Sequence, residues 1–288
     1  MKAIVVEGGA MRGIFAAGVL DFFLANDYNP YDLAIGVSAG ASNLVSFLAK
    51  QPRRSYQVIT RLATDAQFYS PKRFLKGGNL VDVKWLVHHS EQTYPLDKKA
   101  LFSNTPLFAT TTNVATGKAD YYALTPTNLE QVLEATCALP IVYKETPCFS
   151  GQCYTDGGVA DSIPVIEAYQ RGAKEITVVL SHPLSYQMPE RRSALLFKGL
   201  LKRYPMIGQA MAERAKRYNQ SLEFIRQPPK DAIVRVIAPP ESYAVKRLTM
   251  DKALLEQGYN MGQEEGKKHL ASRQGLYGPN QENCHFCI

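Results

Sequence analysis

Two short stretches near the start of the sequence decide the fold: AIVVEGGAMRG at residues 3–13 and DLAIGVSAG at residues 32–40. Each begins with aliphatic residues typical of a buried parallel strand and continues into a glycine-rich turn. An amphipathic helical pattern follows each turn, over residues 14–24 and about residues 41–50. Strands that alternate with helices in this way predict an α/β fold, a mostly parallel central sheet with helices on both faces.

The same patterns extend over the rest of the chain without an internal repeat or a long linker. Further strands are predicted at residues 107–112, 176–181 and 232–237, and further helices at residues 129–137, 163–171, 193–204, 207–224 and 250–269. We therefore predict a single domain over residues 1–273, with a core at about 3–181 and a helical C-terminal region at about 190–270. The last residues, 274–288, are predicted to be a poorly ordered tail.

Composition excludes several classes of protein. Hydrophobic residues make up 45% of the 288 residues and charged residues 20%, which is typical of a globular chain and not of a disordered one. No apolar run approaches the roughly 18 residues of a membrane span, and the N-terminus lacks the apolar stretch of a signal peptide. Five unevenly spaced cysteines favour reduced thiols, and Cys284-x-x-Cys287 lacks a second ligand pair for a metal. We predict a cytoplasmic protein that holds no metal.

The net charge of +7 is concentrated in residues 191–217. This basic segment carries eight Lys and Arg residues and a single acid, Glu213, and leucines alternate with the bases in its first half. The pattern indicates an amphipathic helix, which either docks on the protein with a solvated basic face or lies on an anionic membrane surface. Docking is favoured, and peripheral contact at the inner face of the membrane is kept as a hypothesis. No nucleic-acid-binding signature accompanies the charge, so we expect no nucleic-acid partner.

The second glycine turn matches the nucleophile elbow, G-x-S-x-G, with Ser38 at its centre. Gly36 and Gly40 would leave room for the strained backbone of such a serine. The predicted helix would direct its positive end at the serine oxygen and favour negative charge there. The alternative is an ordinary glycine-rich connection, but the strand before and the helix after favour a catalytic Ser38.

The first glycine turn, Gly8–Gly13, is predicted to collect backbone N–H groups at a helix start, where they can bind an anion. In a hydrolase this anion is the oxyanion of the tetrahedral intermediate. A dinucleotide fingerprint opens in a similar way, but it needs an acidic residue at the end of the second strand. That strand ends in Gly36, Val37 and Ser38, so the turn favours an oxyanion hole over a dinucleotide site.

A catalytic serine needs a base, and the sequence offers two. Asp156 precedes Gly157 and Gly158, whose flexible backbone would expose the carboxylate, and an aspartate can accept the hydroxyl proton directly. His182 follows a predicted strand and would serve in a Ser-His-Asp esterase of the α/β-hydrolase type. The structural alternative for Asp156 is that it caps a turn. Asp156 is the favoured base.

The order of these elements resembles the patatin-like phospholipases, serine hydrolases that use a Ser-Asp dyad. The resemblance lies in the glycine turn with Arg12, the elbow around Ser38, the sequence ATCALP at residues 135–140 and the motif Asp156-Gly157-Gly158, and it covers about residues 3–181. It implies that Ser38 is the nucleophile and Asp156 the base. The implied oxyanion turn comprises Gly8, Gly9, Ala10, Met11, Arg12 and Gly13, with the N–H donors on Gly9, Ala10 and Met11 and with Arg12 holding the loop.

Two positions depart from the family pattern. Ala10 replaces the third glycine of the usual run, which keeps an N–H donor but narrows the backbone angles available. Asp161-Ser162 stands where the family usually has asparagine, which puts one supporting hydrogen bond in doubt.

The function that the resemblance implies is cleavage of acyl esters of lipids through an acyl-enzyme, as in a phospholipase A, a lysophospholipase or a carboxylesterase, without a cofactor. The expected partners are therefore lipids or simpler acyl esters. A second hypothesis is a lipid-binding or regulatory protein that keeps the elbow but turns over little substrate, and the altered glycine run is the feature in its favour.

Overall fold

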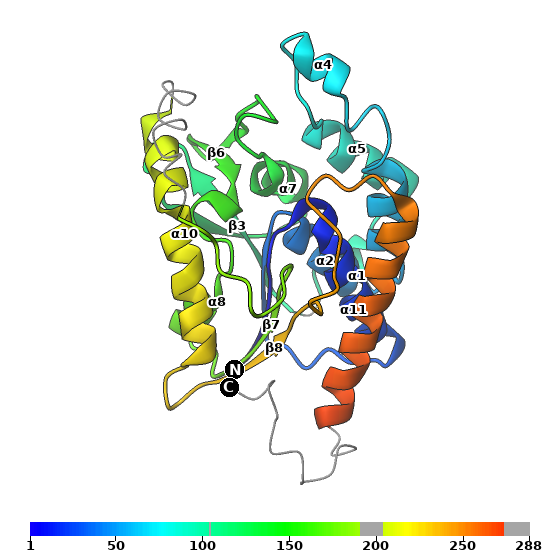
Figure 1. Cartoon of the computed structure of the whole chain (residues 1–288), viewed down its shortest axis with the longest axis vertical. Coiled ribbons are helices and arrows are strands. Elements are labelled where there is room, and N and C mark those ends of the chain that lie inside the picture. Colours follow the sequence, from blue (N-terminus) through cyan, green and yellow to red (C-terminus); the bar gives the residue numbers. More distant parts are fainter. Residues whose placement is uncertain (104, 191–203, 274–288) are drawn as a thin grey trace.

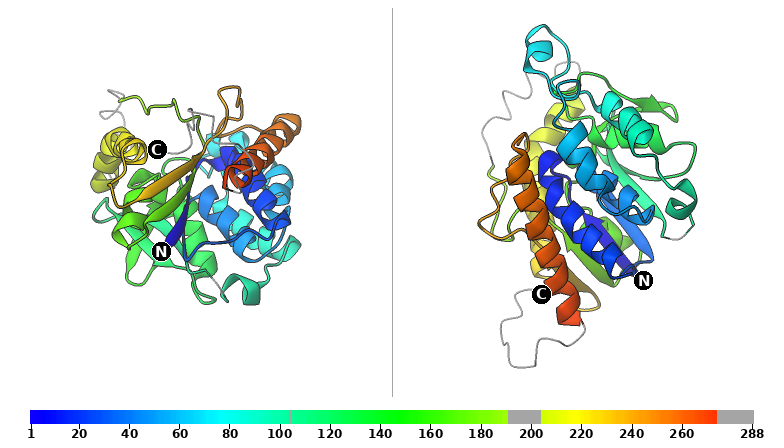
Figure 2. Two further views of the ribbon diagram at one scale, coloured as in Figure 1. Left: turned by 90° about the horizontal axis from the view of Figure 1, so that it is seen from below. Right: turned by 90° about the vertical axis from the view of Figure 1, so that its right-hand side faces the viewer.

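The computed structural model describes residues 1–103, 105–190 and 204–273, and within them an eight-stranded sheet runs through the molecule (Figures 1 and 2). The strand order is β5-β6-β3-β2-β1-β7-β8, and β4 pairs with β3 beside this path. The strands are β1 (Lys2–Val6), β2 (Leu33–Val37), β3 (Leu107–Asn113), β4 (Ala119–Ala123), β5 (Cys148–Phe149), β6 (Gln152–Asp156), β7 (Glu175–Val179) and β8 (Ile233–Ile237). Strands β3, β2, β1, β7 and β8 are parallel, which confirms the predicted sheet, whereas the antiparallel β4, β5 and β6 were not predicted.

Helices cover both faces of the sheet, as predicted (Figure 1). One face carries α1 (Ile14–Ala25), α2 (Ala39–Leu48), α7 (Leu129–Cys137) and α11 (Lys252–Arg273), and the other carries α8 (Val165–Gln170) and α10 (Pro205–Arg226). The shorter elements are α3 (Arg54–Gln57), α4 (Pro71–Leu75), α5 (Val83–Thr93), α6 (Lys98–Leu101), the 3-10 turns η1 (Ala10–Gly13) and η3 (Gly157–Val159), and the π turn η2 (Val58–Leu62). The helix predicted at residues 193–204, apart from its last residue, and the tail predicted at 274–288 lie outside the described residues.

The sheet is apolar because both of its faces are buried. In β1, Ile4 and Val6 pack into the core beneath α1 and α2, whereas Ala3 and Val5 pack into the core beneath α8 and α10. All four side chains are fully buried. A continuous aliphatic run, and not an alternating one, is therefore the pattern that this strand requires.

Helices α1 and α11 lie side by side with their backbones in contact (Figure 2). A Cβ atom on Gly18 of α1 would lie 2.1 Å from the carbonyl oxygen of Tyr259. A Cβ atom on Gly262 of α11 would lie 2.0 Å from the carbonyl oxygen of Phe15. Only glycine permits this approach, and it attaches the C-terminal helix to the first helix of the sheet.

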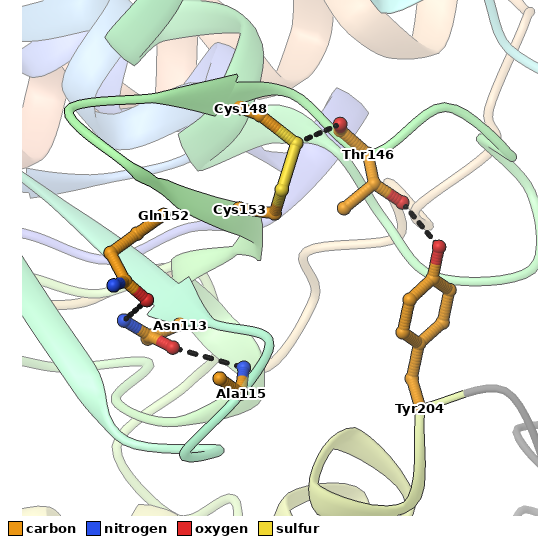
Figure 3. Close-up of a disulfide and its surroundings, with 7 residues drawn as sticks. All are labelled: Asn113, Ala115, Thr146, Cys148, Gln152, Cys153 and Tyr204. Atoms are coloured by element: carbon orange, nitrogen blue, oxygen red, sulfur yellow. Dashed lines mark hydrogen bonds between the residues drawn. A yellow bond between two sulfur atoms is a disulfide. The ribbon is translucent and has the colours of Figure 1, made fainter.

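A disulfide between Cys148 and Cys153 closes the β5–β6 hairpin (Figure 3). The two cysteines are directly paired across the antiparallel strands, with their Cα atoms 4.0 Å apart. The prediction that all cysteines are reduced thiols is therefore wrong. It relied on the odd number of cysteines, but an odd number does not prevent two of them from forming a disulfide across a hairpin. Cys137 is a free thiol. Reduced cysteines were one argument for a cytoplasmic location, and the disulfide removes that argument. The cytoplasmic location stays a prediction.

The basic segment 191–217 is described only from Tyr204 onward, so its first half lies outside the described residues. In the described half, Arg214 donates from Nε to the carbonyl of Gly158 at 2.5 Å, and Arg217 donates from Nε to the carbonyl of Ala160 at 2.7 Å. Both guanidinium groups are thus used inside the protein, as docking requires. Among the described residues, no helix has the length and apolar character that a membrane span needs. Contact with a membrane surface and the single-domain organisation stay predictions.

Candidate active site

The ends of two strands meet beside β3, and this meeting brings Ser38 and Asp156 together. Strand β2 is parallel to β3 and ends with Val37 opposite Thr110. Strand β6 is antiparallel to β3 and ends with Asp156 opposite Thr111. Because β4 pairs with both threonines from the other edge, β2 and β6 lie end to end along one edge of β3. Ser38, the residue after β2, therefore faces the last residue of β6.

Ser38 occupies a sharp turn between β2 and α2. Its φ of 52° and ψ of −126° are strained for a residue with a side chain. The N–H of Ser38 donates to Oγ1 of Thr136 at 2.8 Å, and the Thr136 hydroxyl donates in turn to the carbonyl of Thr110 at 2.6 Å. A Cβ atom on Gly40 would lie 2.3 Å from the carbonyl oxygen of Val6, so this turn requires glycine there. Thr136 is a support that sequence reasoning missed.

The two carboxylate oxygens of Asp156 have different surroundings. Oδ1 accepts the N–H of Gly158 at 2.8 Å and so caps the turn η3. Oδ2 is buried and accepts no hydrogen bond of standard geometry from a described residue, although the Ser38 hydroxyl is near enough to favour the charged form. Burial raises the pKa of Asp156, and the Ser38 hydroxyl, the Gly158 N–H, Arg214 and Arg247 oppose that rise. A buried carboxylate with a raised pKa and one free oxygen is suited to accept a proton.

The loop after Asp156 is held from α10. Arg214 donates from Nη2 to Oγ of Ser162 at 3.1 Å, and the Ser162 hydroxyl donates to the carbonyl of Gly158 at 2.8 Å. Asp161 instead accepts the Tyr121 hydroxyl at 2.8 Å. The family usually has asparagine at the position of Asp161-Ser162, and its absence had put one supporting hydrogen bond in doubt. Here Ser162 and Arg214 hold the loop with hydrogen bonds of their own.

The first glycine turn is fastened to the end of β7. Oε2 of the buried Glu7 accepts the N–H of Ser181 at 2.6 Å, and Nη2 of the buried Arg12 donates to the Ser181 hydroxyl at 3.2 Å. Burial raises the pKa of Glu7 and lowers the pKa of Arg12, and the opposite charge of each partner counteracts both shifts. Arg12 thus holds the turn through Ser181. Neither Glu7 nor Ser181 was singled out from the sequence.

Ala10 adopts a left-handed conformation, with φ of 51°. This is the position where the family usually has glycine, and a side chain in such a conformation costs about 1–2 kcal/mol. The next N–H in the turn, that of Met11, donates to the carbonyl oxygen of Arg247 at 3.3 Å. Of the three N–H groups assigned to the oxyanion hole, the one on Met11 therefore has a protein partner in this conformation.

His182 is differently placed from the base of a Ser-His-Asp triad. Its ring stacks on Tyr186 with 3.8 Å between ring centroids, and the described residues include no hydrogen bond between His182 and Ser38. Burial, together with the charges of Arg12, Arg247 and Arg214, lowers the pKa of His182 to about 3.

A cavity of about 150 Å³ begins at Ser38 and extends beneath α5 and α7. Its wall is mostly apolar and includes Val45, Ile59, Phe68, Leu86, Leu133 and Met250. An apolar cavity that is lined in part by a serine fits the hydrocarbon part of a ligand.

Comparison with known proteins assigns the family. A sequence model of patatin-like phospholipases matches residues 4–169. The chain belongs to the patatin-like phospholipase family. This confirms the resemblance predicted from the motifs, and it supports lipid acyl hydrolase activity in general, because the family acts on lipid esters. A second family model, for a domain of unknown function (DUF6363), matches residues 204–275.

Two individual proteins are similar to this patatin-like chain. The uncharacterized protein YjjU of Escherichia coli (strain K12) is 34% identical over 278 residues, which cover 94% of this chain and 77% of that protein. The crystal structure of VipD from Legionella pneumophila matches with a TM-score of 0.40 and 13% identity, over 93% of this chain and 67% of VipD.

Proposed function

We propose that this patatin-like protein is a serine hydrolase that cleaves acyl esters of lipids with a dyad of Ser38 and Asp156. The proposal is supported by the meeting of β2 and β6, which brings Ser38 next to Asp156. It is also supported by Oδ2 of Asp156, which accepts no hydrogen bond of standard geometry from a described residue. The apolar cavity at Ser38 supports an acyl chain as the bound group. Phospholipids, lysophospholipids and simpler acyl esters all satisfy this chemistry.

In the proposed mechanism, Asp156 accepts the hydroxyl proton as Oγ of Ser38 attacks the ester carbonyl carbon. The carbonyl π electrons move to the oxygen, and backbone N–H groups of the Gly8–Gly13 turn and the positive end of α2 stabilise the resulting oxyanion. Collapse of the intermediate breaks the ester C–O bond, and the leaving alcohol takes the proton from Asp156. Water, deprotonated by the same carboxylate, then attacks the acyl-enzyme carbonyl carbon. Collapse of this second intermediate breaks the bond between Oγ of Ser38 and the acyl carbon, Oγ takes the proton back from Asp156, and the fatty acid is released.

A weakly catalytic lipid-binding protein is the second candidate. The observation in its favour is the hydrogen bond from the Met11 N–H to Arg247, together with the side chain on the left-handed Ala10. Both features limit the donors that the turn can direct at an oxyanion.

Fluorophosphonate labelling and hydrolysis of a nitrophenyl ester test the proposal on wild type, Ser38→Ala and Asp156→Asn. Ser103→Ala, at an exposed serine that does not line the cavity, is the matched control. We expect labelling to disappear in Ser38→Ala, to slow in Asp156→Asn and to stay unchanged in the control, and kcat to fall by at least about 10³-fold in both dyad variants. A folded wild type that neither labels nor hydrolyses the ester would favour the binding protein instead.

A further inference from the structure

The connection between β8 and α11 crosses the end of the sheet at which α2 begins (Figure 1), and Ser38 immediately precedes α2. It is fastened to the first glycine turn at three points. The Tyr243 hydroxyl donates to the carbonyl of Arg12 at 2.8 Å, and the Met11 N–H donates to the carbonyl of Arg247 at 3.3 Å. Between them, the buried Val245 packs in one apolar cluster with Met11. The connection belongs to residues 204–275 and lies outside the patatin-like match.

Arg247 sits in a closed turn of this connection. The N–H of Lys246 donates to Oγ1 of Thr249 at 2.8 Å, and the N–H of Thr249 donates back to the carbonyl of Lys246 at 3.2 Å. Arg247 lines the same cavity as Ser38. The turn and its backbone bond to Met11 thus hold the backbone of Arg247 beside the proposed oxyanion turn.

Three arginines lie near Asp156 or the loops around it, and their guanidinium groups differ in the hydrogen bonds that they donate. The guanidinium groups of Arg12 and Arg214 donate to protein oxygens that hold the two active-site loops. Arg247 is exposed, and its side chain makes no hydrogen bond or ion pair with any residue that the structure describes. Its positive charge nevertheless acts to lower the pKa of Asp156 and of His182. A free guanidinium at an otherwise mostly apolar cavity is suited to an anionic oxygen group, which it binds through two parallel hydrogen bonds.

We propose that Arg247 is a specificity-determining residue that binds an anionic group of the substrate, a phosphate on the alcohol side of the scissile ester. With the acyl chain against the apolar wall of the cavity and the carbonyl carbon at Ser38, the phosphate on the alcohol would bind Arg247, which lines the same cavity. The proposal rests on the proposed function and deepens it, because residues outside the patatin-like match then select the substrate of the dyad.

The test compares two esters that differ only in the phosphate, monooctanoylglycerol and monooctanoylglycerol phosphate. Fatty acid release is measured for wild type, Arg247→Gln, Arg247→Lys and the control Lys252→Gln, which removes the same charge from an exposed lysine at the start of α11. We expect Arg247→Gln to lower kcat/KM for the phosphate ester by about 10- to 100-fold and to change kcat/KM for the neutral ester by less than about 2-fold. Arg247→Lys should restore part of the difference, because it keeps the charge without the fork. An equal loss for both esters, or no loss for either, would overturn the proposal.

A binding measurement separates this proposal from the proposed function. Calorimetric titration of Ser38→Ala with each ester needs no turnover, so the preference for the phosphate ester should persist there and disappear in the Ser38→Ala/Arg247→Gln double variant. Wild type that hydrolyses neither ester, with this preference intact, would refute the hydrolase and leave the anion site standing. Inorganic phosphate alone is the third ligand. If it binds as tightly as the phosphate ester, the site belongs to the free ion and the lipid assignment fails.

Discussion

The contact between α1 and α11 gives a prediction whose sign follows from geometry. In an unconstrained helix, Gly→Ala stabilises by up to about 1 kcal/mol, because alanine loses less backbone entropy on folding. In Gly262→Ala, however, the new Cβ would lie 2.0 Å from the carbonyl oxygen of Phe15. A backbone atom cannot rotate away, so the helices must separate. Because the contact is with a backbone atom, we take the upper end of the usual overpacking cost, about 3 kcal/mol. We therefore expect a net loss of about 2 kcal/mol in the free energy of unfolding.

Gly266→Ala is the matched control, because it lies one turn further along α11. Its Cβ would lie 3.3 Å from both Cβ of Phe22 and the carbonyl oxygen of Val19, contacts that a shift of the helix by a few tenths of an ångström can relieve. We expect its stability to stay within about 1 kcal/mol of wild type. Urea unfolding at equilibrium measures both variants, and the thermal midpoint of Gly262→Ala should fall by about 4–8 °C. Equal stability of the two variants would refute the backbone contact between α1 and α11.

Three further predictions concern Asp156 and the disulfide. Because burial raises the pKa of Asp156 above its usual 3.8, the acid limb of the kcat/KM profile should lie above pH 3.8, and activity should fall as the pH drops through the raised value. The same burial destabilises the charged carboxylate at neutral pH, so Asp156→Asn should melt at a higher temperature than wild type at pH 7. Below about pH 3.8 the carboxyl group is protonated in both the folded and the unfolded state, and the difference in melting temperature should disappear. Equal melting temperatures at pH 7 would contradict the raised pKa. Reduction of the disulfide between Cys148 and Cys153, which are five positions apart, should lower the free energy of unfolding of wild type by at most about 2 kcal/mol, as measured by urea unfolding. The reductant should not change the stability of the control variant Cys148→Ser/Cys153→Ser. If the reductant had no effect on wild type, the bond would be absent in solution.

Much of the fold follows from local sequence patterns. The aliphatic runs of β1, β2 and β7 and the helix at residues 129–137 were predicted because burial on both faces and helical periodicity leave direct traces in neighbouring residues. Strand β6 was missed, and Asp156 was placed in a turn. The reason is that this short strand is defined by its pairing with β3, which lies far away in the sequence.

The candidate site divides in the same way. The glycines around Ser38 and after Asp156 are legible in the sequence, because sharp turns need particular residue types wherever the rest of the chain lies. The supports are not legible: Thr136 beneath Ser38, Ser181 beside Arg12, and Arg214 on the loop after Asp156 each contribute a single polar group from a distant element. Nothing in the residues adjacent to these groups indicates their partners.

The sequence alone therefore determined the family, the mostly parallel sheet and the two glycine turns, because strand burial and turn geometry are local requirements. The tertiary structure decided which residues face each other. It set β2 and β6 end to end along β3, paired Cys148 with Cys153, and brought Arg247 from the C-terminal region to the cavity at Ser38. These arrangements depend on the register of antiparallel strands and on a backbone contact between helices at opposite ends of the chain, and such contacts form only when the whole core packs.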